Sequence, residues 1–170
     1  MDKHWILGVD PGAKTGWCVY DARARCVVEA GHFDENNIPV PQPESWRHVL
    51  AVAVERAKGY GPTYPQVVDC GWVGGRLIER LHFVLGVPAH ERLRREVYKA
   101  LGAGLNGEIH IRNDATVWAA LKLLHGGEGC DVKAKAADKK GNGGREGGPL
   151  AGVTSHARQA LAVAVAVSMS

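Results

Sequence analysis

The chain has 170 residues, 45% of them hydrophobic and 23% charged, and a formal net charge of +3. This length suits one domain with a single buried core, and we expect residues 1–170 to form it. The sequence contains no apolar run near the roughly 20 residues of a membrane span and no signal-peptide pattern at its N-terminus. Four cysteines without a C-x-x-C pair indicate reduced thiols rather than a zinc site. We therefore expect a cytoplasmic protein without a membrane partner.

The N-terminal segment is predicted to form a three-stranded antiparallel meander. The apolar run 5–9 is typical of a strand covered on both faces. The following turn at 10–14 contains a proline and a glycine, and runs 15–20 and 26–33 return as the second and third strands. This pattern puts Asp10 at the end of the first strand.

The middle of the chain is predicted to contain helices and one short strand. After a polar, proline-rich loop at 34–43, apolar residues at helical spacing predict an amphipathic helix from about Trp46 to Gly59. The run 66–70 is predicted to be a short strand that ends near Asp69. Further helices are expected at 75–85, 97–101 and 113–124.

The C-terminal third contains a glycine- and lysine-rich stretch at 126–149, which we predict to be a mobile loop. The run 160–167 alternates Ala or Leu with Val, so periodicity alone would assign it to a strand. Its alanine content and the possible N-caps Thr154 and Ser155 favour a helix that packs closely on a sheet. The expected fold class is thus α/β, with a mixed sheet flanked by helices.

Asp10 and Asp69 are the first candidates for chemistry, since each is predicted to end an apolar strand. If the two strands are adjacent and parallel, both carboxylates emerge at one edge of the sheet. Converging carboxylates repel each other and favour a hard cation between them, such as Mg²⁺ or Mn²⁺. The alternative is that each aspartate ends its strand facing water.

Four segments, taken in order, have a more specific pattern. They read ILGVDPG at 6–12, VVDCGW at 67–72, EVYKALG at 96–102 and HARQALAVA at 156–164. Together they resemble the RuvC family of Holliday-junction resolvases, within the ribonuclease H-like superfamily. The match extends over most of the chain.

The resemblance implies a ribonuclease H-like fold and an endonuclease that cuts four-way or other branched DNA as a homodimer, without a small-molecule cofactor. It implies two Mg²⁺ or Mn²⁺ ions per active site, with Asp10 shared by both, Asp69 on one, and His156 binding or orienting from the last helix. Hydrolysis by such a site leaves nicks with 5′-phosphate ends.

Two catalytic positions depart from the family pattern. Asp69 is one methylene shorter than the usual Glu, and Gln159 stands where the family has a second helical Asp. An amide oxygen is neutral and a weaker ligand, so the site is expected to have one negative charge fewer. The sequence therefore predicts weaker metal binding, and a preference for Mn²⁺.

The candidate DNA-binding residues are one aromatic and several basic side chains. Trp72 falls where the family has an aromatic wedge, and an indole there offers bases a stacking surface; the alternative is a core tryptophan. Lys99 follows a family pattern and could reach the scissile phosphate. The surrounding basic residues predict a surface that follows the DNA backbone, with a solvated charged face as the alternative. They are Arg92, Arg94 and Arg95, and Arg76 is a further basic candidate for DNA binding.

Two other functions remain open from the sequence. The first is a junction-binding protein without catalysis, in which Gln159 marks a decayed site. The second is an actin-like or sugar-kinase ATP-binding domain, suggested by the segment 8–12. That fold needs a second comparable domain to enclose the nucleotide, for which the chain is too short.

Overall fold

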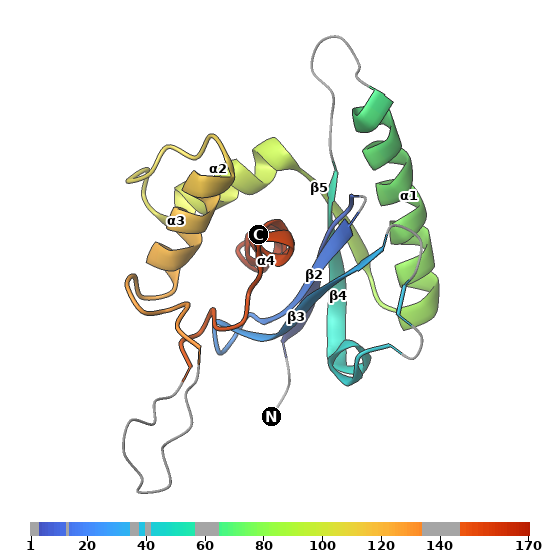
Figure 1. Ribbon diagram of the computed structural model, residues 1–170, viewed down its shortest axis with the longest axis horizontal. Helices are drawn as coiled ribbons and strands as arrows, with labels where there is room; N and C mark the ends of the chain where they lie inside the picture. The colour runs from blue at the N-terminus through green and yellow to red at the C-terminus, as the bar shows by residue number, and fades with distance from the viewer. Residues whose placement is uncertain (1–3, 13, 35–37, 40–41, 57–64, 134–146) are drawn as a thin grey trace, which may run out of the picture.

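The computed structural model describes residues 4–12, 14–34, 38–39, 42–56, 65–133 and 147–170, and leaves out the side chains of 65–73 and 156. At its centre lies a five-stranded sheet in the order β3-β2-β1-β4-β5 (Figure 1). The strands are β1 (Trp5–Asp10), β2 (Lys14–Asp21), β3 (Cys26–Asp34), β4 (Val49–Arg56) and β5 (Ala89–Leu93). The helices are η1 (Glu44–His48), α1 (Pro65–Leu85), α2 (Arg94–Gly104), α3 (Asp114–Leu124) and α4 (Ser155–Ser168).

The sheet is mixed, as the sequence predicts. Strands β1, β2 and β3 form the expected antiparallel meander. Strand β1 also pairs with β4, and β4 with β5, and both of these pairs are parallel. The C-terminal ends of β1, β4 and β5 therefore lie along the same edge of the sheet.

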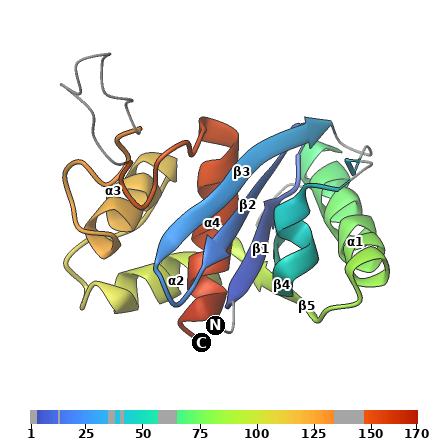
Figure 2. The same cartoon turned by 90° about the horizontal axis from the view of Figure 1, so that it is seen from below.

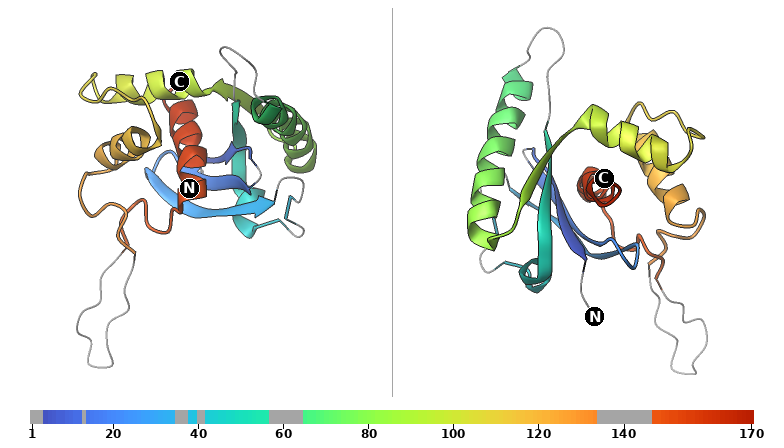
Figure 3. Two further views of the ribbon diagram at one scale, coloured as in Figure 1. Left: turned by 45° about the horizontal axis from the view of Figure 1, so that its top comes forward. Right: turned by 180° about the vertical axis from the view of Figure 1, so that it is seen from behind.

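Helices cover both faces of the sheet. Helix α1 packs on one face and α4 on the other, while α2 and α3 lie against the side of α4 that faces away from the strands (Figures 1, 2 and 3). Alternation along β1 separates the two cores: Leu7 and Val9 pack toward α1, and Gly8 faces α4.

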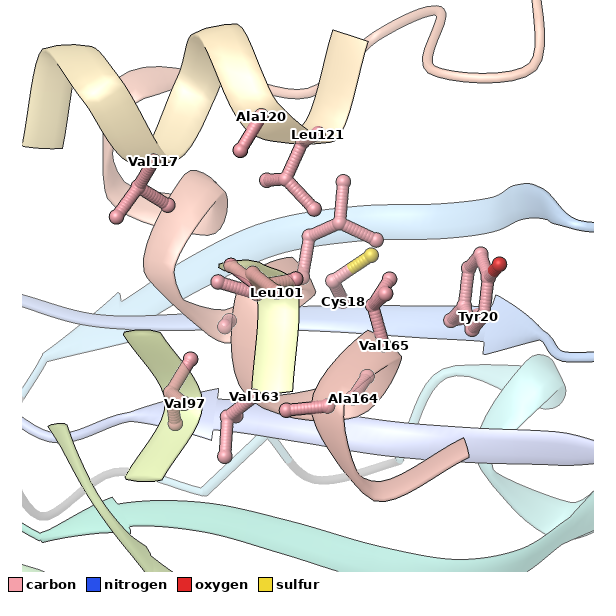
Figure 4. Close-up of a cluster of buried hydrophobic side chains, with 14 of the residues drawn as sticks. Cys18, Tyr20, Val97, Leu101, Val117, Ala120, Leu121, Val163, Ala164 and Val165 are labelled. Carbon is pink, nitrogen blue, oxygen red and sulfur yellow. The ribbon is translucent and has the colours of Figure 1, made fainter. Parts of the chain in front are cut away.

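Helix α4 is buried on nearly every side, which explains its composition. Its residues 160–166 are all buried between the sheet and helices α2 and α3 (Figure 4). Small and β-branched side chains allow this close packing. A Cβ on Gly8 would lie only 1.9 Å from the carbonyl oxygen of Ala160. The prediction of a helix packed closely on a sheet is confirmed.

Two predicted elements are wrong. The segment expected to be a helix from Trp46 to Gly59 contains the short 3-10 helix η1 and then strand β4. Its apolar residues lie on both faces of a central parallel strand, where polarity does not alternate, and their spacing imitates a helical stripe. The expected strand 66–70 lies in the first two turns of α1, whose first residue, Pro65, has a ring that suits the start of a helix.

The remaining helices agree with expectation: 75–85 lies within α1, 97–101 within α2, and 113–124 coincides with α3 apart from its N-cap. Strand β5 was not predicted. Residues 134–146 of the expected mobile loop lie outside the described residues. In the described part of the chain, no helix combines the length and apolar character that crossing a membrane requires.

Candidate active site

Two strands of the parallel part of the sheet have an acidic residue at or next to their last position, after the same pattern of residues. Strand β1 ends Leu7-Gly8-Val9-Asp10, and β4 contains Val52-Ala53-Val54-Glu55. Val9 pairs with Val54, so the next residue on each strand is a carboxylate at the same edge. The sheet thus brings together Asp10 and Glu55, and the second acid of the site is Glu55.

Both acids lie on the α4 side of the sheet. Side chains alternate along a strand, and Gly8 and Ala53, two residues before each acid, face α4. The small size of these two residues lets the helix approach the strands closely. The same close packing keeps Glu55 only 2% exposed.

A basic residue joins the acids from the third parallel strand. Arg94 directly follows β5 and is the first residue of α2. Its Nε donates a short hydrogen bond to Oε1 of Glu55, and it also interacts electrostatically with Asp10. The Arg94 side chain remains 46% exposed, so it can still contact a ligand from solvent.

The cluster has more negative charge than its surroundings favour. Burial, and next the charge of Glu55, raise the pKa of Asp10 from 3.8 to about 7, although Arg94 acts in the opposite direction. Burial likewise raises the pKa of Glu55 despite its ion pair. Proximity to Glu55 raises the pKa of Arg94 above its ordinary value. An additional cation at this edge would relieve the repulsion between the carboxylates.

Two further polar residues approach the cluster from the helices. Gln159, in α4, is 5% exposed, and its Nε2 donates to Oδ1 of Asp114 over 2.6 Å. Asp114 is the first residue of α3, and its Oδ1 lies 4.0 Å from Nη1 of Arg94. The charge of Asp114 contributes to the raised pKa of both Asp10 and Glu55. Asp114 therefore lies within the electrostatic reach of the site.

The donor set suits a hard divalent cation. Mg²⁺ is commonly held by one or two carboxylates, with water and substrate phosphates completing its coordination. Within the described residues, two buried oxygens have no hydrogen-bond partner: Oε2 of Glu55 and Oε1 of Gln159. No three His, Cys, Asp or Glu side chains of the described part are arranged to hold an ion by themselves. The residues of the site therefore suit an ion that takes some of its ligands from water or substrate.

The structure changes the role expected of Asp69. Its assignment to the metal site depended on a strand beside β1, and that strand is β4 with Glu55 instead; Asp69 lies in α1. A Cβ on Gly74 would lie 3.5 Å from Cγ of Pro11, so α1 passes close to the turn after β1. Trp72 lies two residues before this point. The side chains of both predicted residues fall outside the described part.

His156 and Gln159 start α4 one helical turn apart. Gln159 reaches the cluster through Asp114, whereas the side chain of His156 falls outside the described part. The expectation that His156 binds or orients a metal stays a prediction.

The predicted basic residues lie in three separate places. Arg94 is within the cluster. Lys99 lines a shallow hollow with Ala166 and Ser170, at the other end of α4. Ala166 is about 10 Å along the helix axis from Gln159. Arg76 and Arg95 are exposed on α1 and α2.

Glu55 and Asp114 are the site residues that the sequence analysis missed. Glu55 had a readable signal, because the apolar run before it ends in an acid just as the run before Asp10 does. The helical interpretation of that segment hid it. Asp114 follows the N-cap Asn113, a pattern typical of a helix start, and nothing in the sequence connects it with residues 10 or 55.

Comparison with solved structures gives two close matches in fold. A Thermus thermophilus RuvC structure matches with a TM-score of 0.57 and 19% identity, covering 97% of this chain and 93% of that chain. T. thermophilus RuvC in complex with Holliday junction substrate matches with a TM-score of 0.55 and 17% identity, covering 98% and 93%. No family model and no curated relative matches. This chain has the ribonuclease H-like fold of RuvC, as its sequence motifs predict.

Proposed function

We propose that this chain is a divalent-metal-dependent endonuclease that cuts branched DNA. The observation that supports the proposal most strongly is the pair Asp10 and Glu55, which lie at the C-terminal ends of adjacent parallel strands in a fold shared with a junction resolvase. Buried acids held together against their mutual repulsion are typical of a site that binds a cation.

In this proposal Asp10 and Glu55 hold Mg²⁺ or Mn²⁺. Bound there, the metal would lower the pKa of an attacking water and stabilise charge on the leaving 3′ oxygen, so that hydrolysis leaves 5′-phosphate ends. The expected two ions per site, and a ligand role for His156, belong to the same proposal. Gln159 acts on the site indirectly, through its hydrogen bond to Asp114.

Arg94 is the positively charged side chain of this site that contacts the DNA. Its half-exposed guanidinium can donate charge-assisted hydrogen bonds to a phosphate oxygen while still neutralising Glu55. Trp72, in the turn of α1 beside the active edge, is proposed to stack on unpaired bases. Lys99, Arg76 and Arg95 are proposed to contact the DNA backbone farther from the cut.

We further propose that two copies act together, because symmetric cleavage of a four-way junction requires two active sites. A junction-binding protein without catalysis would share the fold but not the cleavage. The ATP-binding alternative is not favoured by the comparisons.

The test is cleavage of a synthetic four-way junction, compared with a linear duplex of the same sequence, in Mg²⁺ or Mn²⁺. Wild type should nick the junction preferentially, and the Asp10→Asn and Glu55→Gln variants should be inactive while still binding it. Glu79→Gln, which removes an exposed acid from α1, is the matched control and should cleave as wild type does. Binding without cleavage by wild type, in both metals, would refute the nuclease proposal.

A further inference from the structure

Asp114 is a carboxylate near the site that comes from a helix, α3, whereas Asp10 and Glu55 come from the ends of strands. It starts α3, and its side chain is largely exposed, at 74%. Within the described part of the chain, its Oδ1 accepts a 2.6 Å hydrogen bond from Nε2 of Gln159. An exposed aspartate normally points into solvent, whereas this one is held by a buried amide.

Arg94 lies close to both Glu55 and Asp114, and so shows how near Asp114 is to the other acids. The guanidinium donates to Glu55 through Nε, and its Nη1 lies 4.0 Å from Oδ1 of Asp114. A positive group thus already lies between these two carboxylates. Within the described residues no three carboxylates are placed to bind one ion directly, so Asp114 would act on an ion held by Asp10 and Glu55 through a water bound to that ion.

Gln159 itself is poorly satisfied where it lies. The side chain is 5% exposed, and its Oε1 has no hydrogen-bond partner among the described residues. Its other end, Nε2, is committed to Asp114. A buried amide with one end unpaired costs free energy, and that cost is offset if the free oxygen faces a cation or a cation-bound water.

We propose that Asp114 adds a third carboxylate charge to the metal site, acting on the ion through bound water, and that Gln159 positions it. This inference rests on the proposed nuclease function, and it changes the prediction of a charge deficit. The neutral residue on α4 does not leave the site one charge short, because its amide holds a carboxylate from α3 in place.

The experiment measures Mn²⁺ binding by the full-length chain, from the electron paramagnetic resonance signal of free Mn²⁺, without DNA. Asp114→Asn keeps an oxygen that can accept from Nε2 of Gln159, so it removes the charge and spares the contact. We expect Asp114→Asn to weaken Mn²⁺ binding at least about tenfold. Asp131→Asn removes the same charge from a surface ion pair with Lys122 and should leave Mn²⁺ binding unchanged.

The decisive variant is the double exchange Asp114→Asn with Gln159→Glu. It moves the carboxylate to α4 and the amide to α3 without changing the size of either side chain, and it preserves one hydrogen bond between them. Mn²⁺ affinity should return to within about threefold of wild type, and metal-free thermal unfolding should show that each variant is folded.

Three results would overturn the inference or its basis. Wild-type affinity in folded Asp114→Asn, together with lost affinity in Asp10→Asn, would exclude Asp114 and leave the proposed site standing. Unchanged affinity in both variants would refute the metal site itself. If the double exchange binds Mn²⁺ as weakly as Asp114→Asn does, a carboxylate at position 159 cannot replace the one at position 114.

Discussion

Replacing Asp10 by Asn is expected to stabilise the protein at neutral pH while abolishing metal binding. The substitution keeps the shape of the side chain and removes the charge that the site disfavours. Because burial and Glu55 raise the pKa of Asp10 in the folded state, the folded protein holds this proton more tightly than the unfolded chain does.

The size and the pH window follow from that pKa. Ionising Asp10 costs the folded state nothing below about pH 4, and the cost grows until the pH passes about 7. A shift of one pKa unit corresponds to about 1.4 kcal/mol, so the contribution of Asp10 should lower the free energy of unfolding of wild type by as much as about 4 kcal/mol between pH 4 and 8. An acid in a stabilising ion pair has the opposite effect, because its contribution to the free energy of unfolding rises with pH.

The measurement is urea unfolding from pH 4 to 8, with a chelator present throughout. The urea midpoint of Asp10→Asn should exceed that of wild type at pH 8 and converge with it at pH 4. Added Mg²⁺ should raise the midpoint of wild type and leave Asp10→Asn unchanged, because a ligand stabilises only the state that binds it. Asp131→Asn is the control and should follow the wild-type pH trend.

The reasoning is refuted if Asp10→Asn unfolds at the same or a lower urea concentration than wild type at pH 8. That result would mean that the carboxylate is well solvated or well paired in the fold. The electrostatic case for a cation at this edge would then fail, even if the strands end where the structure places them.

Two other substitutions test the packing and the ion pair. Gly8→Ala should destabilise the fold by at least about 3 kcal/mol, because a Cβ there meets the backbone of α4; Gly75→Ala has open space and should be neutral or slightly stabilising in thermal unfolding. Arg94→Gln should cost about 2 kcal/mol, below the about 3–5 kcal/mol of a fully buried pair because the guanidinium is half exposed. Arg94→Gln should also tighten Mn²⁺ binding to Glu55 and slow junction cleavage. The control Arg56→Gln, which removes an exposed ion pair, should change neither the Mn²⁺ affinity nor the cleavage rate. Weaker Mn²⁺ binding in Arg94→Gln would contradict the view that the arginine and the metal ion compete for Glu55.

The sequence was sufficient where local pattern and tertiary environment agree. The meander from Trp5 to Asp34 has short turns between strands, and α4 has an alanine-rich composition that suits a close approach to a sheet. Asp10 was correctly expected at a strand end, because a turn follows it directly.

Prediction failed where burial on both faces removes the periodic signal. The valines of β4 are buried on a central parallel strand, so no alternation with polar residues distinguished a strand from a helix. Strand β5 has the polar sequence AHERL and forms only through its parallel pairing with β4. The second acid was therefore sought at Asp69, whereas the acid that the sheet places beside Asp10 is Glu55, which the sequence analysis assigned to a helix.

The arrangement of the site follows from the parallel part of the sheet rather than from any single motif. The C-terminal ends of parallel strands lie at one edge of a sheet. Here that edge has Asp10 from β1, Glu55 from β4 and Arg94 directly after β5. Close packing of α4 then excludes water from the acids, which strengthens both their repulsion and their attraction for a cation. Arg94 offsets part of that repulsion, yet Asp10 still has a pKa near neutrality. The residual repulsion is what a divalent ion would relieve, so the same buried charges that lower the stability of the fold would supply its affinity for metal.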